Sequence, residues 1–159
     1  MVSIAIAPAA GAPMEGRHEI RAVPGRGLEG DRYFVGTGHY SGRPSPGGRE
    51  VTLIETETIA ALLDGVLNAE GETLGIEMTA AESRRNIATS GVPLNHLVGR
   101  TFRVGAVRMR GTRLCEPCKY LEDLTGRPRL MHGLLHRGGL RAQILTEGVI
   151  RVGDVVRPE

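Results

Sequence analysis

Glycine and proline interrupt this chain so often that long regular elements are excluded. Its 159 residues include 23 glycines and 9 prolines. Glycine weakens the interior of a helix or strand, and proline breaks both. Aromatic residues make up only 3%, so the core must be built from Val, Leu, Ile and Ala. The length fits one domain, and we expect a single domain over residues 1–159 made of many short elements.

Short runs rich in β-branched residues recur along the chain and predict strands. Apolar residues at helical spacing are confined to a few places. Many strands with few short helices indicate a mainly β, barrel-like fold. Strands are expected at residues 2–7, 19–23, 50–54, 84–89, 101–104, 106–110, 140–145 and 149–156, and helices at 55–67, 94–98, 117–124 and 129–135.

The most linker-like stretch is GTGHYSGRPSPGG at residues 36–48. Small residues and prolines of this kind form turns rather than strands. Neither flank is long enough to form its own core, so we place no domain boundary here. We expect a flexible surface loop over residues 36–49, which is a candidate lid.

The formal net charge is +2, too small for binding along a nucleic-acid backbone, so we expect no nucleic-acid partner. Lys119 is the only lysine, and every other basic residue except histidine is arginine. Biased codon usage is the simpler explanation of this preference, and it does not exclude a functional one. Alternatively, some of the guanidinium groups grip a planar anion or a phosphate with two hydrogen bonds.

No apolar run approaches the roughly 20 residues that span a bilayer, so we expect no membrane partner. Residues 1–7 lack the basic segment of a signal peptide and read as a first strand. The chain has two cysteines, at Cys-x-x-Cys spacing, which does not suggest a disulfide framework. We expect a cytoplasmic protein with reduced thiols.

The run LCEPCKY at residues 114–120 is the most informative for chemistry. Cys118 is expected in the first turn of a helix that begins at Pro117. Helix N-termini carry partial positive charge and unpaired N–H groups that stabilise a thiolate, and Lys119 adds a cation. A Cys118 thiolate would suit sulfur transfer and soft metals.

Other interpretations of the two cysteines stay open. Cys118 could be a small hydrophobic core residue, or it could form a redox pair with Cys115, although no βαβ pattern surrounds them. His132 and His136 follow at the spacing of a Cys2His2 zinc site. Against zinc, Tyr120 stands too close to Cys118 to form the core of a zinc finger.

Two arginine-containing runs are candidates for binding an anion. If residues 84–89 form a strand, Arg84 and Asn86 share one face and together can bind a phosphate or a pterin edge. A surface salt bridge from Arg84 to a nearby glutamate is the alternative. In HRGGLR at residues 136–141, two glycine N–H groups can meet an anion, although such a pair is as often a plain turn.

Taken in order, these segments resemble the MOSC domain, the module at the C-terminus of molybdenum-cofactor sulfurases. The resemblance implies a MOSC-type, pyruvate-kinase-like β-barrel with a few short helices. The sequence contains no Walker-type loop and no Gly-x-Gly-x-x-Gly motif between a strand and a helix, which disfavours a nucleotide-dependent enzyme. The matching runs are GDRY at residues 30–33, RRNI at 84–87, LVGRTFRVG at 97–105, CEPCKYL at 115–121, RGGLRA at 137–142 and GVIRVGD at 148–154.

The resemblance also implies a pocket for molybdenum cofactor or for sulfur carried as a persulfide. By that resemblance Cys118 matches the cysteine that ligates molybdenum in the amidoxime-reducing members, and it is the expected catalytic and metal-binding residue. Arg84 and Asn86 match an Arg-x-Asn element beside the cofactor. The remaining expected cofactor-binding residues are Asp31, Arg32, Lys119, Arg137 and Arg141.

Three functions remain open from the sequence. The first is reduction of N-hydroxylated or N-oxygenated compounds by bound molybdenum cofactor, with electrons from a donor protein. The second is a carrier that receives sulfur at Cys118 from a donor protein and delivers it to metallocentres. The third is a zinc-stabilised binding module. Larger members add an N-terminal β-barrel domain, so closure of a cofactor pocket here would depend on residues 36–48 or on a second subunit.

Overall fold

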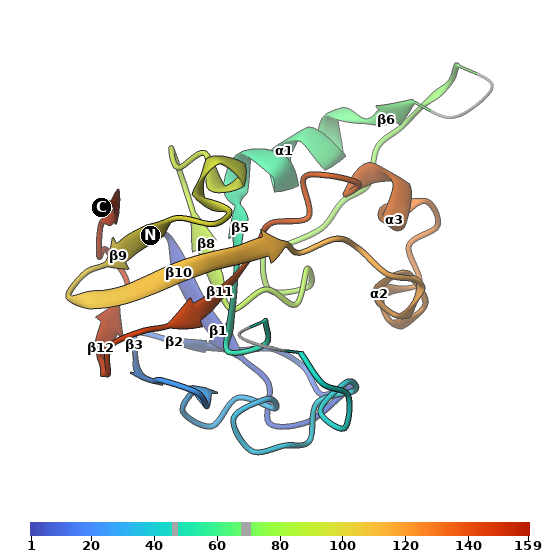
Figure 1. Cartoon of the computed structure of the whole chain (residues 1–159). Helices are drawn as coiled ribbons and strands as arrows, with labels where there is room; N and C mark the ends of the chain where they lie inside the picture. Colours follow the sequence, from blue (N-terminus) through green and yellow to red (C-terminus); the bar gives the residue numbers. More distant parts are fainter. Residues whose placement is uncertain (46–47, 68–70) are drawn as a thin grey trace.

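The computed structural model describes residues 1–45, 48–67 and 71–159 (Figure 1). An eight-stranded sheet, in the order β13-β9-β10-β11-β5-β8-β1-β2, forms its body. Neighbouring strands run antiparallel except β5 and β8, which are parallel. The strands are β1 Ser3–Ile6, β2 Glu15–Arg17, β5 Val51–Glu55, β8 Ile87–Thr89, β9 Thr101–Val104, β10 Val107–Leu114, β11 Leu140–Ile144 and β13 Val156–Pro158.

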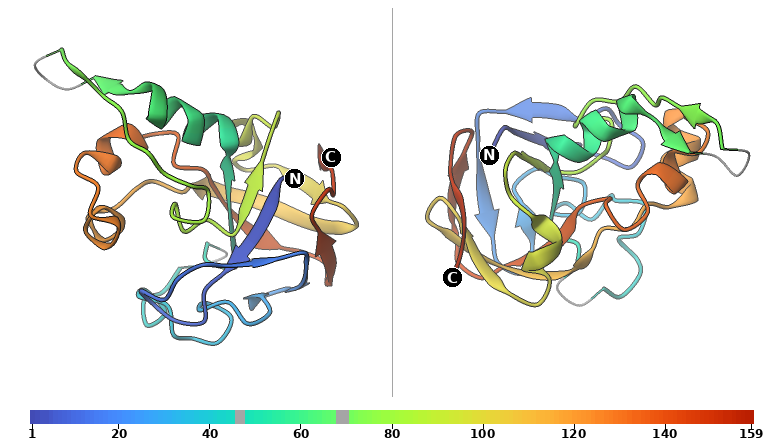
Figure 2. Two further views of the ribbon diagram at one scale, coloured as in Figure 1. Left: turned by 180° about the vertical axis from the view of Figure 1, so that it is seen from behind. Right: turned by 90° about the horizontal axis from the view of Figure 1, so that it is seen from above.

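A smaller sheet of β12 (Gly148–Arg151), β3 (Glu19–Val23) and β4 (Gly27–Leu28) completes the barrel-like body. Seen from above, the strands curl around a common interior (Figure 2). Both sheets contribute side chains to one core, because alternate residues of each strand point inward. The expected mainly β, barrel-like fold is confirmed.

The helices gather on one side of the large sheet (Figure 1). They are α1 Thr56–Asp64, η1 Leu94–Leu97, α2 Lys119–Thr125 and α3 Leu130–Gly133, and a hairpin of β6 (Val66–Leu67) and β7 (Thr73–Leu74) follows α1. A second hydrophobic cluster forms between α1, α2, α3 and the adjoining strands β5 and β8; it contains Ile54, Leu62, Ile76, Met78, Ala88, Leu121, Leu130 and Leu134. None of the helices in the described ranges has the length and hydrophobicity to cross a membrane.

Several element boundaries differ from the sequence predictions. The helix expected from residue 117 begins at Lys119, because Cys118 is extended (φ −139°) and serves as its N-cap. The helix expected at 129–135 is shorter, since Arg129 adopts a left-handed φ of 67°. The strand expected at 149–156 splits into β12 and β13 around Gly153, where φ is 95°.

Residues 36–49, expected to form a surface loop, adopt turns and bends at their described positions. Positions 46 and 47 of this loop lie outside the described residues. The loop joins the small sheet to β5, so its two ends are held by the barrel body. Its flexibility stays a prediction.

Gly139 is held at a point where the backbone of β5 leaves no room for a side chain. Its φ is +100°, and a Cβ there would overlap the carbonyl oxygen of Leu53. Gly153 has a similar φ of +95° but open space around it. Substitutions at the two glycines therefore allow the cost of backbone strain to be distinguished from the cost of steric overlap.

We predict that Gly139→Ala lowers the free energy of unfolding more than Gly153→Ala does. Backbone strain costs both variants about 1–3 kcal/mol, and overpacking costs Gly139→Ala about 1–3 kcal/mol more. Urea unfolding followed by circular dichroism measures both values. Equal destabilisation would show that β5 moves freely away from the turn.

Candidate functional site

Cys118 lies at the edge of a small cavity between α2 and the large sheet. The cavity has a volume of about 70 Å³. Cys118 is half-buried and packs in part against the second hydrophobic cluster. The cavity is lined mainly by aromatic and arginine side chains, namely Tyr33, His39, Tyr40, Tyr120, Arg32, Arg84, Arg85 and Arg141.

Two aromatic residues of the 36–45 segment cover this cavity. The His39 ring stacks on Tyr120 with centroids 4.0 Å apart and planes 13° apart. Tyr40 meets the same ring edge-on at 6.4 Å, and it lines the cavity together with Cys118. Burial, and then Cys118, raises the pKa of Tyr40 above its usual value. These contacts hold residues 39 and 40 of the loop against Tyr120, beside the cavity that Cys118 lines. We call His39, Tyr40 and Tyr120 the aromatic latch.

Sequence reasoning did not find the aromatic latch. His39 and Tyr40 lie in a stretch whose composition indicates only a linker, and Tyr120 was considered only for a zinc finger. The one available signal was that all three tyrosines of this aromatic-poor chain fall near the glycine-rich loop or the cysteine run. Aromatic residues in such places commonly contact ligands or close a pocket.

Arg85 is a structural residue that holds the cysteine segment against the sheet. Its buried guanidinium donates to the carbonyl oxygens of Gly138 at 2.8 Å, Ser83 at 3.0 Å and Cys115 at 2.9 Å. A Cβ at Gly138 would lie 2.5 Å from the Cys115 carbonyl oxygen, so only glycine fits. The Gly138–Gly139 pair thus serves packing and hydrogen bonding within the fold.

Asp31 and Asn86 are also committed to the fold. The Asp31 carboxylate accepts the Ala7 N–H at 3.3 Å and the Asn86 side-chain amide at 3.2 Å. The Asn86 side-chain oxygen accepts both the N–H and the hydroxyl of Thr52. Both residues are buried, and neither lines the cysteine cavity.

Arg32 reaches the cavity wall but is already neutralised. Its Nη1 lies 3.1 Å from the Asp31 carboxylate, and its Nη2 donates to the Arg84 carbonyl oxygen at 3.1 Å. The side chain is 9% exposed. Arg32 therefore positions the backbone of Arg84 rather than offering a free cation.

Arg84 keeps hydrogen-bonding capacity beside the cysteine. It adopts a left-handed φ of 62°, so the expected strand alternation of Arg84 with Asn86 is wrong, and β8 begins only at Ile87. Its Nη1 donates to the Ala12 carbonyl oxygen at 2.7 Å, but its buried Nη2 has no hydrogen-bond partner among the described residues. Burial, and then the Arg32 cation, lower the pKa of Arg84 below its usual value. An anion in the cavity would relieve both penalties.

The other predicted cofactor-binding residues divide between cavity and surface. Arg141 lines the cavity and donates to the Gly48 carbonyl oxygen at 3.1 Å. Arg137 instead donates to Gly133, and it lies outside the cavity lining. Lys119 points to solvent, where its amino group pairs with acidic residues of the next helical turn.

The spacing of the cysteines and histidines does not produce a metal cluster. Cys115 is buried in the fold, whereas His132 and His136 are exposed. His136 pairs with Glu116 at 3.0 Å. Among the described residues, no group of three or more His, Cys, Asp or Glu side chains could hold a metal ion. A Cys2His2 zinc site is therefore not assembled in this structure.

Glu82 fixes the turn that carries Arg84. Its Oε2 accepts the N–H and hydroxyl of Thr79 at 2.8 and 2.9 Å, and Arg127 lies 2.6 Å from its Oε1. These contacts, led by the Thr79 N–H, lower the pKa of Glu82 to about 2. The surface salt bridge that we considered for Arg84 is thus made by Arg127.

Comparison with known proteins assigns the family. Residues 31–157 match the MOSC domain, which is most of the chain. This chain is a member of the MOSC family. No curated protein compared with the sequence matches it significantly.

Solved structures of similar fold agree with this MOSC architecture. YuaD from Bacillus subtilis superposes with a TM-score of 0.72 at 16% identity, covering 97% of this chain and 91% of that one. YiiM from Geobacillus stearothermophilus gives 0.69 at 15% identity, covering 99% and 73%. YiiM from Escherichia coli gives 0.63 at 16% identity, covering 100% and 70%. At such identities the likeness concerns the fold alone.

We predict that the folded MOSC domain has one fast-reacting thiol, Cys118. Cys115 is 1% exposed, so its reaction needs a local opening and should be at least about tenfold slower. Titration with a disulfide reagent such as Ellman's reagent measures both rates. Cys118→Ala should abolish the fast phase and Cys115→Ala should keep it. A fast phase that is lost in Cys115→Ala and kept in Cys118→Ala would contradict the burial of Cys115.

We predict that Glu82 stabilises the MOSC domain in a pH-dependent way. Because its folded pKa of about 2 lies below the usual 4.5, its stabilisation is full above 4.5 and is lost as pH falls towards 2. Glu82→Gln should therefore be less stable than the unmodified chain at about pH 7, with a smaller difference at about pH 3. Urea unfolding at both values measures this, with exposed Glu29→Gln as the control. A difference that does not change with pH would refute it.

Proposed function

We propose that this MOSC protein binds molybdenum cofactor through the Cys118 thiolate. The observation that carries the proposal is that the half-buried Cys118 and Arg84 line one cavity, and that the Arg84 Nη2 has no hydrogen-bond partner among the described residues. MOSC membership supports it, because the domain is associated with this cofactor. The cytoplasm, where thiols stay reduced, is the compartment that fits this chemistry.

The side chains present fit the chemistry of the proposed cofactor. A thiolate is a soft ligand that suits molybdenum better than oxygen donors do. Arg84 and Arg141 would bind the anionic edge of the cofactor, since guanidinium groups pair well with phosphate and similar anions. Tyr40 lines the same cavity, and its hydroxyl would orient the sulfur by donating a hydrogen bond to it.

The cysteine cavity is too small to hold the cofactor while the loop is in the position seen here. A volume of about 70 Å³ has room for on the order of two water molecules, whereas small-molecule sites usually occupy about 300–1,000 Å³. The cofactor would therefore enter only when the aromatic latch opens. Movement of His39 and Tyr40 would remove two walls of the cavity at once.

The reaction proposed for the loaded protein is reduction of an N-hydroxylated compound. Bound molybdenum cofactor would supply the two electrons, received from a donor protein, that convert an N–OH group and two protons to N–H and water. In the closed position, the aromatic latch would shield the sulfur from solvent. Arg84 would hold negative charge near the sulfur.

The small cavity favours a second candidate, a persulfide carrier. One additional sulfur atom on Cys118 fits a space of about 70 Å³ without opening the latch. Tyr40 and Arg84 would then stabilise the terminal sulfur anion by hydrogen bonding. A sulfur-donor protein would load the site, and a metallocentre would receive the sulfur.

We predict that protein purified from a host that makes molybdenum cofactor contains molybdenum, and that Cys118→Ala loses it because the ligand atom is gone. Elemental analysis by mass spectrometry measures molybdenum and zinc per chain. Cys115→Ala is the matched control, since that buried thiol lies outside the proposed ligand role. Molybdenum retained by Cys118→Ala would refute the ligand assignment.

The same samples distinguish the second candidate. An increase of about 32 Da, one sulfur atom, on the Cys118 peptide identifies a persulfide. A persulfide without molybdenum supports the carrier. Neither molybdenum nor added sulfur would refute both candidates.

A further inference from the structure

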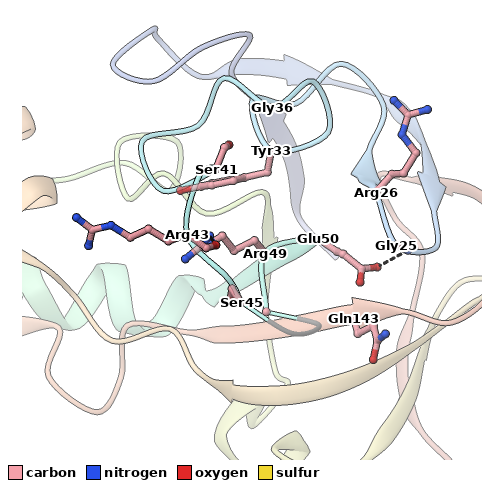
Figure 3. A pocket seen from close by; sticks show the side chains of 11 residues that line it. Gly25, Arg26, Tyr33, Gly36, Ser41, Arg43, Ser45, Arg49, Glu50 and Gln143 are labelled. Atoms are coloured by element: carbon pink, nitrogen blue, oxygen red, sulfur yellow. Dashed lines mark hydrogen bonds between the residues drawn. The ribbon is translucent and has the colours of Figure 1, made fainter.

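A second cavity, next to the cysteine cavity, gathers arginine side chains (Figure 3). Its volume is about 440 Å³, within the range of small-molecule sites. Tyr33 lines both cavities, which makes them neighbours. Hydroxyl and amide groups of Ser41, Ser45 and Gln143 complete the polar lining. Arg26, Arg43 and Arg49 line the cavity, whereas Arg113 and Arg141 contact its lining residues Ser45 and Gly48. We call four of these residues the arginine cluster: Arg43, Arg49, Arg113 and Arg141.

The side chains of Arg43 and Arg49, which both line the cavity, lie next to each other in Figure 3. Arg49 donates from Nη1 to the carbonyl oxygens of Tyr40 and Arg43. Both guanidinium groups approach the Tyr40 ring, at 5.3 Å and 5.8 Å from its centroid. Burial lowers the pKa of Arg49, and the other three members of the cluster lower it further. The Arg49 cation is therefore close enough to the other three to be repelled by them.

A β-bulge brings the other two members together. The register between β10 and β11 shifts between Gly111 and Arg113, so that Arg113 lies opposite Arg141. Without this shift Thr112 would face Arg141, and Arg113 would turn to the other face of the sheet. Like charges directly opposite each other destabilise a strand pair. Such bulges often re-aim side chains at functional sites.

The rim of the cavity joins both pairs of arginines. Arg141 donates to the Gly48 carbonyl oxygen at 3.1 Å, and Arg113 lies 3.3 Å from the Ser45 hydroxyl. A Cβ at Gly48 would stand 3.4 Å from the Arg113 guanidinium and 2.7 Å from that hydroxyl. The glycine therefore lets Arg113 approach the rim closely.

The charge of the cluster is not balanced within the described residues. None of its four members forms an ion pair there. Glu50 also lines the cavity, but its Oε2 accepts the N–H groups of Gly25 and Ile144. Burial raises the pKa of Glu50, which weakens its role as a counter-charge. Cations held close together without a carboxylate repel one another, and a bound anionic ligand would reduce that repulsion.

We propose that the arginine cluster binds the phosphate or diphosphate group of a small-molecule ligand. Guanidinium forks match phosphate oxygens with paired hydrogen bonds, and the cavity is large enough for more than a single ion. The phosphate could belong to a ligand whose other end reaches Cys118, or to a separate phosphorylated molecule. Binding at the cluster does not depend on the chemistry of Cys118.

Titration calorimetry with inorganic pyrophosphate tests this site. The full chain should bind pyrophosphate saturably, and the double variant Arg43→Gln with Arg113→Gln should bind at least about tenfold more weakly, because charged hydrogen bonds are lost. Arg157→Gln, which removes one exposed arginine of β13, is the control and should change affinity less than about twofold.

Stability measurements separate a binding role from a structural role. Without pyrophosphate, Arg113→Gln should have a melting temperature equal to or above that of the unmodified chain, since it removes repulsion from Arg141. With pyrophosphate, only chains with an intact cluster should gain stability as its concentration rises. A lower melting temperature of Arg113→Gln in the absence of pyrophosphate would indicate a structural residue and overturn the assignment.

Absence of saturable binding, or equal binding by the double variant, would also overturn the proposal. Cys118→Ala should keep its pyrophosphate affinity, so failure of this site and failure of the cysteine proposal are distinguishable. Molybdenum content then identifies the source of the phosphate. A double variant that loses molybdenum assigns the phosphate to a ligand shared with Cys118, and one that keeps it assigns a separate molecule.

Discussion

The geometry of the cysteine cavity depends on the buried guanidinium of Arg85. Its hydrogen bonds join the carbonyl oxygens of Ser83, Cys115 and Gly138, which belong to segments far apart in the sequence. A buried carbonyl left without a partner costs about 1–3 kcal/mol, so these three bonds strongly favour one position of the cysteine segment. Because that position is fixed, Cys118 faces the cavity although its own helix is short.

The sequence predicted most of the longer strands because their hydrophobic alternation is local, but it missed the short strands β2, β4, β6 and β7. It also predicted that Cys118 is the reactive candidate, since a proline and a helix start are visible nearby. It could not predict the positions of Arg84 and Asn86, because a left-handed φ at an arginine leaves no mark in the sequence. That single backbone conformation sends Arg84 to the cavity and leaves Asn86 inside the fold with Asp31.

The arginine cluster was beyond sequence reasoning for a different reason. Arg43 and Arg49 lie in a stretch that composition marks as a linker, while Arg113 and Arg141 lie on strands that only tertiary structure pairs. Their meeting also needs a bulge at Gly111, and a one-residue change of register reverses the face of every following side chain. Arg141 was a predicted cofactor-binding residue, but in an arginine-rich chain Arg43, Arg49 and Arg113 are each typical of ordinary surface charge.

Residues of one loop line both cavities. Residues 39 and 40 close the cysteine cavity, whereas Arg43 and Arg49 hold the neighbouring one. The two aromatic contacts with Tyr120 would cost on the order of 1–3 kcal/mol to break. A ligand that needs the open loop would therefore bind about 5- to 150-fold more weakly than to a preopened site. Any anion whose affinity for the arginine cluster differs between loop positions shifts that equilibrium, and so controls access to Cys118.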